Sequence, residues 1–288
     1  MFVDAYALAK HFTRPIVIST RRLNGTVESA VATYVLLNGD GWFLTAGHVF
    51  GLWREFELHL PEVQAYRATE AAINADPSLD ADGRQGAFAR LAATVDLAWI
   101  ENCSAWWGID GLAFRDVSVI DDLDLAVGRL EPTGLLAGPY PTFKNPDVGL
   151  LPGRSLCRLG FPFEQVAVSF DPARSAFSLD RLQLALFPID GILTRLIALP
   201  GSTAAQFIET SSPGLRGQSG GPVCDSLGRI WGIQSRTAHI ALGFNPTVTA
   251  GGRTFEEHQF INLGWAVHVR QILDALRARG VQVDVSAD

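Results

Sequence analysis

Apolar residues along this chain fall mainly into short β-branched and aromatic runs, separated by turns rich in glycine, asparagine and proline. The turns include Asn24-Gly25 and the segment 38–41, both typical of β-hairpins. With 28 glycines and 15 prolines, the chain has the turn residues that a β-rich fold needs. The pattern predicts strands at residues 16–20, 29–37, 42–45, 155–162, 206–210, 229–235 and 260–267, and further strand within 177–199.

Two segments show helical spacing instead. The segment 268–277 predicts a C-terminal helix, because its apolar residues recur three and four positions apart: Val269, Ile272, Leu273 and Leu276. Residues 68–93 predict one or two helices interrupted near Pro77.

The helical stretch belongs to a predicted insertion over about residues 62–115. Its last part, 102–108, contains Trp106-Trp107. These aromatic residues either pack the insertion onto the rest of the chain or form a rim near a site, and packing is the simpler interpretation.

The composition excludes several classes of protein. Hydrophobic residues make up 48% and charged residues 18%, which is typical of a globular protein with an ample core. The net charge of −7 excludes a broad basic surface for nucleic acid. No apolar run is long enough to span a membrane, so we expect no membrane partner.

The cysteines and the N-terminus bear on the compartment. Cys103, Cys157 and Cys224 are odd in number and widely spaced, so we expect no disulfide framework and a reducing compartment. The first residues show no basic start followed by a long apolar run. We therefore expect no secretory leader and a cytoplasmic location.

The segment 214–223 carries the strongest chemical signal. It reads Gly-Leu-Arg-Gly-Gln-Ser-Gly-Gly-Pro-Val, with Ser219 between two glycine-rich arms. Glycines adopt backbone angles closed to other residues, so the N–H groups of Gly217 and Ser219 can converge on one point beside the hydroxyl. Converging donors of this kind stabilise an oxyanion. The alternative is a glycine-rich turn between two strands, with Ser219 as a turn residue.

A histidine far upstream supports the catalytic interpretation. His48 follows the predicted strand ending in Thr45-Ala46-Gly47. The small residues before it let an imidazole at the lip of a sheet approach a neighbouring strand. A lone histidine is most often a polar filler, but one paired with Ser219 is a candidate general base.

The two motifs together, Thr45-Ala46-Gly47-His48 and then Gly217-x-Ser219-Gly220-Gly221-Pro222, resemble those of the trypsin/chymotrypsin-like serine peptidases. The disulfide-free bacterial branch is the more similar one, and the resemblance spans about residues 15–280. It implies an all-β fold of two antiparallel six-stranded Greek-key barrels, with the helical insertion in the first barrel and the C-terminal helix. It also implies one peptidase domain over 1–288. Its predicted parts are the first barrel at 15–135, the connector at 136–152, and the second barrel with the C-terminal helix at 153–280.

The resemblance also implies an aspartate that orients the histidine. The family places it at the start of a strand reading roughly Asp-Ile/Leu-Ala-Leu/Val-x-x-Leu. Asp124 fits at every position, and it precedes Ser219 by 95 residues (219 − 124), which is normal for the family. Asp96 is the alternative, but bulky Trp99 and polar Asn102 follow it where small and apolar residues are wanted. Either aspartate could instead be a solvated carboxylate at a strand edge.

In the family, the strand after the serine lines the specificity pocket and pairs with the substrate backbone. By that match Ser235, Arg236 and Thr237 border the pocket, and Pro213 lies near its floor. Proline replaces the acidic floor of trypsin-type enzymes, which argues against cleavage after lysine or arginine. Arg216 and Arg236 favour an acidic group on the substrate, although exposed arginines are usually just solvated.

One residue departs from the family pattern. Gln218 precedes the serine, where secreted zymogens have an aspartate that captures a newly cut N-terminus. Glutamine cannot form that ion pair, so we expect no activation by N-terminal clipping. The site is either preformed or ordered by a ligand or an activating partner protein.

These observations predict a serine endopeptidase, intracellular and regulatory, that acts on a protein or peptide substrate through His48, Asp124 and Ser219. No metal or organic cofactor is expected. A catalytically silent peptide-binding module with the same fold is one alternative, and a serine esterase is another. The α/β-hydrolase type of esterase orders its residues Ser, acid, His, whereas this chain has His, acid, Ser.

Overall fold

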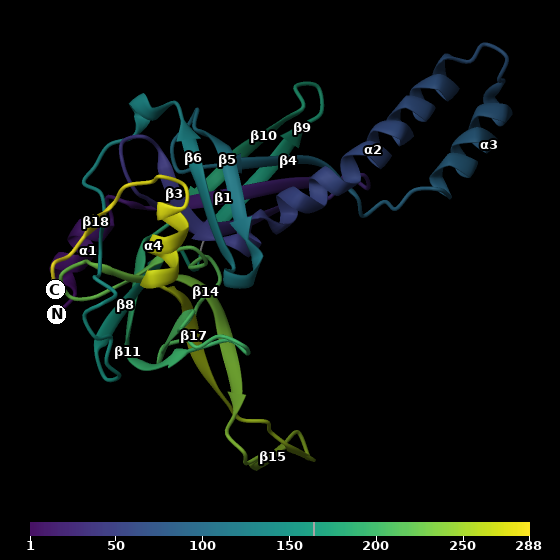
Figure 1. The fold of residues 1–288 in the computed structure, drawn as a ribbon. Coiled ribbons are helices and arrows are strands. Elements are labelled where there is room, and N and C mark those ends of the chain that lie inside the picture. Colours follow the sequence, from purple (N-terminus) through teal and green to yellow (C-terminus); the bar gives the residue numbers. More distant parts are fainter. Residues whose placement is uncertain (164) are drawn as a thin grey trace.

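A computed structural model describes residues 1–163 and 165–288, and it contains two β units with helices attached (Figure 1). The first unit is a six-stranded antiparallel sheet in the order β4-β1-β2-β3-β6-β5. Its strands are β1 (Thr13–Arg22), β2 (Val27–Leu36), β3 (Trp42–Ala46), β4 (Ile100–Trp106), β5 (Ala113–Ile120) and β6 (Leu125–Glu131). The neighbours β4-β1-β2-β3 have the order of a Greek key.

The second unit repeats the same topology. Its main strands run in the order β13-β8-β11-β12-β17-β14, and pairing of β13 with β14 closes them into a barrel. These strands are β8 (Ser155–Gly160), β11 (Phe187–Ile197), β12 (Phe207–Thr210), β13 (Pro222–Cys224), β14 (Ile230–Ala241) and β17 (Phe260–His268). The short strands β7 (Thr142–Phe143) and β18 (Asp284–Val285) extend the sheet beyond β14.

The predicted all-β class is therefore confirmed, with one difference between the units. Among the strand pairings of the described residues, none joins β4 to β5, so the first unit is an open half-barrel. The connection between those strands contains Trp107, whose side chain is buried in the core of the unit. Aromatic packing thus occupies the side that hydrogen bonds leave open.

The insertion is a helical hairpin that projects from the first unit (Figure 1). It consists of α2 (Gly51–Ala75) and α3 (Ala81–Ala92). The helical part begins at Gly51 and not near residue 62, and α2 continues through Pro61. Residues 100–106, which we placed within the insertion, form β4 of the sheet.

The base of the hairpin is fixed to the sheet by polar contacts. Arg67 on α2 donates from Nε to Glu101 Oε1 at 2.6 Å. His59 Nδ1 accepts from the N–H of Ile100 at 3.0 Å. Of the two tryptophans in 102–108, Trp107 packs inward against the rings of Tyr34 and Phe43, whereas Trp106 is half-buried and donates from Nε1 to Asp110.

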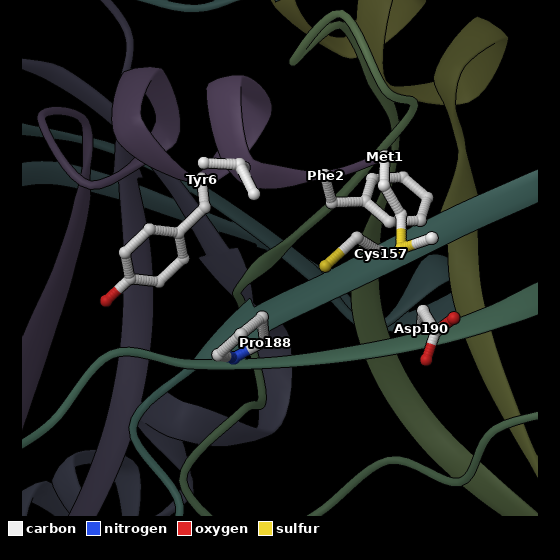
Figure 2. A pocket seen from close by; sticks show the side chains of 7 residues that line it. Met1, Phe2, Tyr6, Cys157, Pro188 and Asp190 are labelled. Carbon is white, nitrogen blue, oxygen red and sulfur yellow. The ribbon is translucent and has the colours of Figure 1, made fainter.

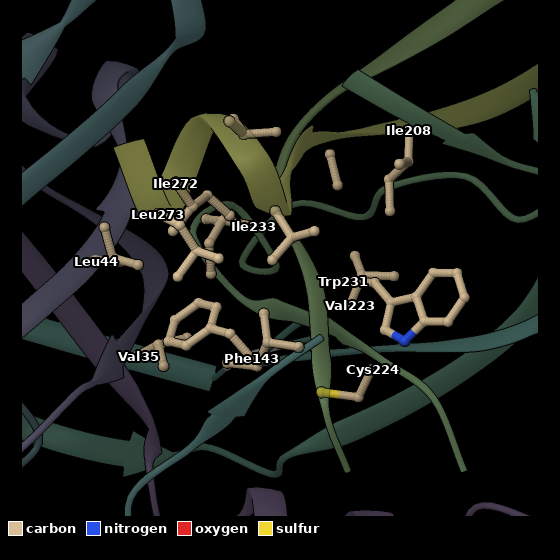
Figure 3. Packing of buried hydrophobic residues seen from close by; sticks show 14 of the residues in the cluster. Val35, Leu44, Phe143, Ile208, Val223, Cys224, Trp231, Ile233, Ile272 and Leu273 are labelled. Carbon is tan, nitrogen blue, oxygen red and sulfur yellow. The ribbon is translucent and has the colours of Figure 1, made fainter. Parts of the chain in front are cut away.

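The C-terminal helix α4 (Val269–Arg277) contributes to one core with both units. Figure 3 shows Ile272 and Leu273 of this helix beside Ile233 of the barrel and Leu44 of β3. The apolar spacing of the segment explains this packing, because it places these side chains on one helix face. The two β units are thus joined through a shared apolar cluster.

The remaining elements lie at the periphery. Strands β9 (Gln165–Asp171) and β10 (Ala176–Gln183) form one hairpin, and β15 (Thr247–Ala250) and β16 (Arg253–Glu256) form another at the end of the long β14–β17 ribbon (Figure 1). The short helices are α1 (Val3–Ala9), η1 (Gly47–Phe50), η2 (Asp121–Leu123) and η3 (Thr133–Leu135). Among the described residues, no helix combines the length and apolar character needed to cross a membrane.

Candidate active site

The loop that carries Ser219 follows β12 and is held in place by its glycines. Gly217 has φ +87°, and a Cβ there would lie 2.1 Å from the carbonyl oxygen of Phe161. Gly220 has φ +84° and donates its N–H to the Gln234 carbonyl at 2.8 Å. A Cβ at Gly220 would lie 2.1 Å from the Thr33 carbonyl oxygen, so glycine at these two positions lets the loop pack against the segment after β8 and against β2 of the first unit.

His48 comes from the first unit and meets Ser219 of the second. It lies in η1, directly after β3, and its side chain is 51% exposed. The distance from His48 Nε2 to Ser219 Oγ is 2.9 Å. This is a normal hydrogen-bond length, so the imidazole is placed to take the hydroxyl proton.

Asp124 lies on the other side of the imidazole. It follows η2 in the left-handed region, with φ +51°, and its side chain is largely buried. Its Oδ2 is 2.9 Å from His48 Nδ1, and its Oδ1 accepts the His48 backbone N–H at 2.7 Å. These contacts favour the tautomer that has its hydrogen on Nδ1 and leaves Nε2 free to accept from Ser219.

The carboxylate of Asp124 receives a further hydrogen bond from the second unit. The Ser235 hydroxyl donates to Asp124 Oδ2 at 2.5 Å. Burial acts to raise the pKa of Asp124, but hydrogen bonds from His48 and Ser235 outweigh it and hold the pKa below its ordinary value. Asp124 is therefore ionised near neutral pH.

Asp96 does not contact His48 and lies in the turn before β4. Its Oδ1 accepts the N–H of Ala98 at 2.8 Å, and its carbonyl accepts the N–H of Trp99 at 3.0 Å. It therefore stabilises the turn between α3 and β4. Of the two aspartates that the sequence left open, Asp124 is the one that lies against His48.

The two predicted oxyanion donors also lie in the serine loop. The Gly217 carbonyl accepts from Thr33 Oγ1 at 2.6 Å and from the Phe161 N–H at 3.2 Å, which fixes the orientation of this peptide. Within the described part of the chain, the N–H groups of Gly217 and Ser219 donate to no protein acceptor. Both are therefore available to a ligand.

Gln218 closes the loop on itself. Its Oε1 accepts the Leu215 N–H at 3.1 Å, and its own N–H donates to the Leu215 carbonyl at 3.0 Å. The residue is fully buried. The glutamine that departs from the zymogen pattern thus braces the turn before Ser219 from within.

The predicted pocket residues are placed in different ways. Thr237 Oγ1 accepts the Gly214 N–H at 3.0 Å and donates to the Gly214 carbonyl at 2.9 Å. Arg236 is exposed, with its guanidinium 5.0 Å from the centre of the Phe207 ring. Arg216 is exposed and Pro213 is half-buried. Ser235 is buried and bonds Asp124, so its hydroxyl does not face a pocket.

Arg158, which is not among the site residues predicted from the sequence, is buried inside the second barrel. It lies between Cys157 and Leu159 in a strand that otherwise reads as apolar. A charged residue in such a run was the available signal, because arginine is rarely fully buried unless paired.

The structure also has a cavity that lies away from Ser219. A cavity of about 560 Å³ lies beneath α1, lined by Phe2 and Tyr6 of the helix end and by Cys157, Pro188 and Asp190 of the barrel (Figure 2). Cys157 and Arg158 are sequence neighbours on β8, so their side chains point to opposite faces of that strand. Among the described residues, no group of three or more histidine, cysteine or acidic side chains could hold a metal.

The two β units and the serine loop at their junction define the class, a peptidase domain of the two-barrel type. A family model described as the trypsin-like peptidase domain matches residues 32–233. The chain belongs to this family. A search of curated proteins finds no match.

Solved structures of the HtrA-type protease AlgW match this chain, and the one with a TM-score above 0.5 has a similar fold. The structure with a decapeptide is 15% identical with a TM-score of 0.51, and the match covers 96% of this chain and 67% of that chain. The structure with a tripeptide is 16% identical with a TM-score of 0.47, and the match covers 98% of this chain and 65% of that one. This chain therefore spans about two thirds of the length of these structures.

Proposed function

We propose that this peptidase domain is a serine endopeptidase that cleaves protein or peptide substrates through Ser219, His48 and Asp124. The observation that carries the proposal is the continuous series of hydrogen bonds from the Ser219 hydroxyl through the imidazole to the carboxylate, at 2.9 Å for each imidazole nitrogen. Residues from both β units form it, which a simple glycine-rich turn does not require.

The mechanism follows from this geometry. His48 Nε2 takes the hydroxyl proton as Ser219 Oγ attacks the peptide carbonyl. Asp124 holds the imidazole orientation and stabilises the imidazolium that forms. The N–H groups of Gly217 and Ser219 donate to the oxyanion of the tetrahedral intermediate. His48 then returns the proton to the leaving amine, and water hydrolyses the acyl-enzyme by the same route.

The proposal also covers the type of substrate, the cellular compartment and the way in which the site is ordered. The AlgW structures contain bound peptides, which agrees with peptide binding by this fold. We propose an intracellular, cytoplasmic and regulatory role because the free cysteines need no oxidising compartment. The internal bracing by Gln218 favours a site that is ordered without an activating partner.

A fluorophosphonate probe tests the nucleophile directly, because it reacts with an activated serine regardless of peptide preference. We expect labelling of the purified chain at Ser219 and none in Ser219→Ala. Cleavage of an unfolded protein by the wild type then separates a peptidase from an esterase. An unlabelled wild type that still binds peptides would be the catalytically silent module.

A further inference from the structure

Arg158 is a buried cation at the centre of the second barrel. It is 1% exposed and lies on β8. Its Nε donates to Thr210 Oγ1 at 2.7 Å and its Nη1 to Gln234 Oε1 at 2.8 Å. Within the described residues, no carboxylate forms an ion pair with it, and its Nη2 has no hydrogen-bond partner. Burial lowers the pKa of Arg158 to about 9, so it remains charged at neutral pH.

The surroundings of Arg158 contain more donors than acceptors. Ser212 Oγ is also buried without a partner in the described chain. Gln234 accepts with its Oε1, and the described hydrogen bonds give its Nε2 no acceptor. A buried charge without an anion is costly, and buried polar groups are normally satisfied. The set as a whole lacks a negatively charged acceptor.

The guanidinium packs directly against Gly264, where any larger residue would collide with it. A Cβ at this position would lie 2.5 Å from Arg158 Cζ and Nη2, and 2.7 Å from the Ser212 carbonyl oxygen. Gly264 is opposite Thr237 in the β14–β17 pairing. The unsatisfied donors therefore lie behind the same segment of β14 that borders the serine loop.

Backbone hydrogen bonds connect this donor set to the nucleophile. The Gln234 carbonyl accepts from Gly220, and the Gln234 N–H donates to Gly221, both at 2.8 Å. These glycines directly follow Ser219. The Gln234 side chain reaches Gly214 on the other arm of the loop, where a Cβ would be 2.4 Å from Nε2. A side chain that enters beside Ser219 between these arms would meet Gln234 Nε2 and Thr237 Oγ1, with Arg158 hydrogen-bonded behind them to Gln234 Oε1.

We propose that Arg158, with Ser212 and Gln234, binds the carboxylate of an aspartate or glutamate residue immediately before the scissile bond. This inference rests on the proposed peptidase function and specifies its substrate class. The carboxylate supplies the missing anion and accepts from Nη2 of Arg158 and the Ser212 hydroxyl. To reach them it displaces the Thr237 hydroxyl from Gly214, which is on a rotatable side chain, while the bond from Arg158 Nη1 to Gln234 Oε1 stays in place.

Arg158 differs in burial from the two arginines that the sequence suggested for an acidic substrate group. Arg216 and Arg236 are exposed, so water screens their charge. Arg158 is shielded from water and already held by two hydrogen bonds, so a carboxylate would meet a desolvated and oriented cation.

The test is a set of fluorogenic peptides that differ only in the residue before the cut, with Glu compared with Gln and Asp compared with Asn. We expect the wild type to prefer each acid over its amide by about 100-fold in kcat/KM, since a pocket built for a polar group strongly rejects its uncharged analogue. Arg158→Met should remove this preference, and Arg158→Lys should restore part of it. Arg174→Met, an exposed arginine in the β9–β10 hairpin, is the matched control.

Fluorophosphonate labelling of each variant separates this inference from the proposed function. A wild type that is labelled but prefers small or apolar residues before the cut would overturn the acidic preference and leave the proposed serine peptidase function standing. The Arg158 side chain would then only fill the end of the pocket and make it shorter. An unlabelled wild type would overturn both. If Arg158→Met does not fold, Ser212→Ala decides, with an expected drop of about tenfold for acidic substrates only.

A binding measurement gives an independent readout. In Ser219→Ala, a product peptide ending in glutamate should bind more tightly than one ending in glutamine, measured by calorimetry. Equal affinities of the two peptides would contradict the role of Arg158 even if the wild type cleaves neither fluorogenic peptide.

Discussion

The interiors of the two β units differ although their strand order is the same. The first unit is filled by aromatic side chains, with Phe43 and Trp107 at 4.9 Å between ring centres and Tyr34 and Trp107 at 5.4 Å. The second encloses a charged guanidinium with hydroxyl and amide partners. The comparison separates two tasks: the aromatic core supports the strands that carry His48 and Asp124, whereas the guanidinium and its polar partners lie within an otherwise apolar barrel behind the loop of Ser219.

The largest expected effect is on kcat/KM and tests the nucleophile that the second unit supplies. Ser219→Ala removes the nucleophile, and we expect kcat/KM to fall by about five to six orders of magnitude, as in other enzymes of this mechanism. The variant should fold normally because only one hydroxyl is lost. Peptide hydrolysis and circular dichroism together check this, and substantial residual hydrolysis would mean that another group is the nucleophile.

The second largest effect is on kcat and tests the carboxylate that the first unit supplies. Asp124→Asn should lower kcat by about four orders of magnitude, because the amide favours the wrong tautomer of His48. Asp96→Asn is the matched control, since its side chain accepts a turn hydrogen bond away from the imidazole. Steady-state kinetics of both variants decide between the two aspartates; a greater loss in Asp96→Asn would reverse the assignment.

The third prediction concerns a substitution in the aromatic core of the first unit, which leaves His48, Asp124 and Ser219 unchanged. Trp107→Ala should destabilise the fold by about 3–5 kcal/mol, the usual cost of emptying a buried aromatic position. Urea unfolding measures the change, and Trp107→Phe should cost less because most of the contacts survive. A small effect for alanine would show that the open side of the half-barrel does not depend on this ring.

A smaller effect concerns the Ser235 hydroxyl, which reaches Asp124 of the first unit from the second unit. Ser235→Ala removes the hydrogen bond to Asp124 Oδ2, and we expect roughly a tenfold fall in kcat/KM, consistent with one charge-assisted bond. The pKa of Asp124 should rise towards its ordinary value, so the stability profile of the variant should fall less than that of the wild type between about pH 5 and pH 2. An unchanged profile would mean that Ser235 has only a packing role.

The smallest expected effect is on stability as a function of pH. The folded-state pKa of Asp124 lies below its ordinary value, so the unfolded chain binds more protons in the acidic range. This part of the stability is present above the ordinary pKa of an aspartate, about 3.9, and is lost as pH falls through the lower folded value. Wild type should therefore lose more stability than Asp124→Asn between about pH 5 and pH 2, measured by urea titration.

Several features were predictable because they depend on local chemistry. The glycines around Ser219 and the turn residues of the hairpins indicate backbone conformation directly, and the spacing of Ile272 and Leu273 predicts one face of a helix. Strands and C-terminal helix therefore agree with the sequence analysis. The family was predictable from the pairing of His48 with Ser219, since the order of two short motifs is more specific than either alone.

Other features depend on tertiary contacts that no local pattern contains. The start of α2 was missed because Pro61 lies within it and the helix has no strong apolar face. The closure of only one barrel depends on long-range strand pairing. Arg158 looked like an isolated charge in a strand, and its importance is visible only with Thr210 and Gln234 around it.

The helix α4 has a consequence for how substrates enter. Ile272 and Leu273 belong to an apolar cluster that also contains Leu44 and Ile233, so the two β units share one continuous interior. Spreading them apart would expose that interior to water. Separation of the two units as a hinge is therefore disfavoured. On the proposed function, we expect loosely folded regions and exposed loops of other proteins to be cleaved more readily than compact domains.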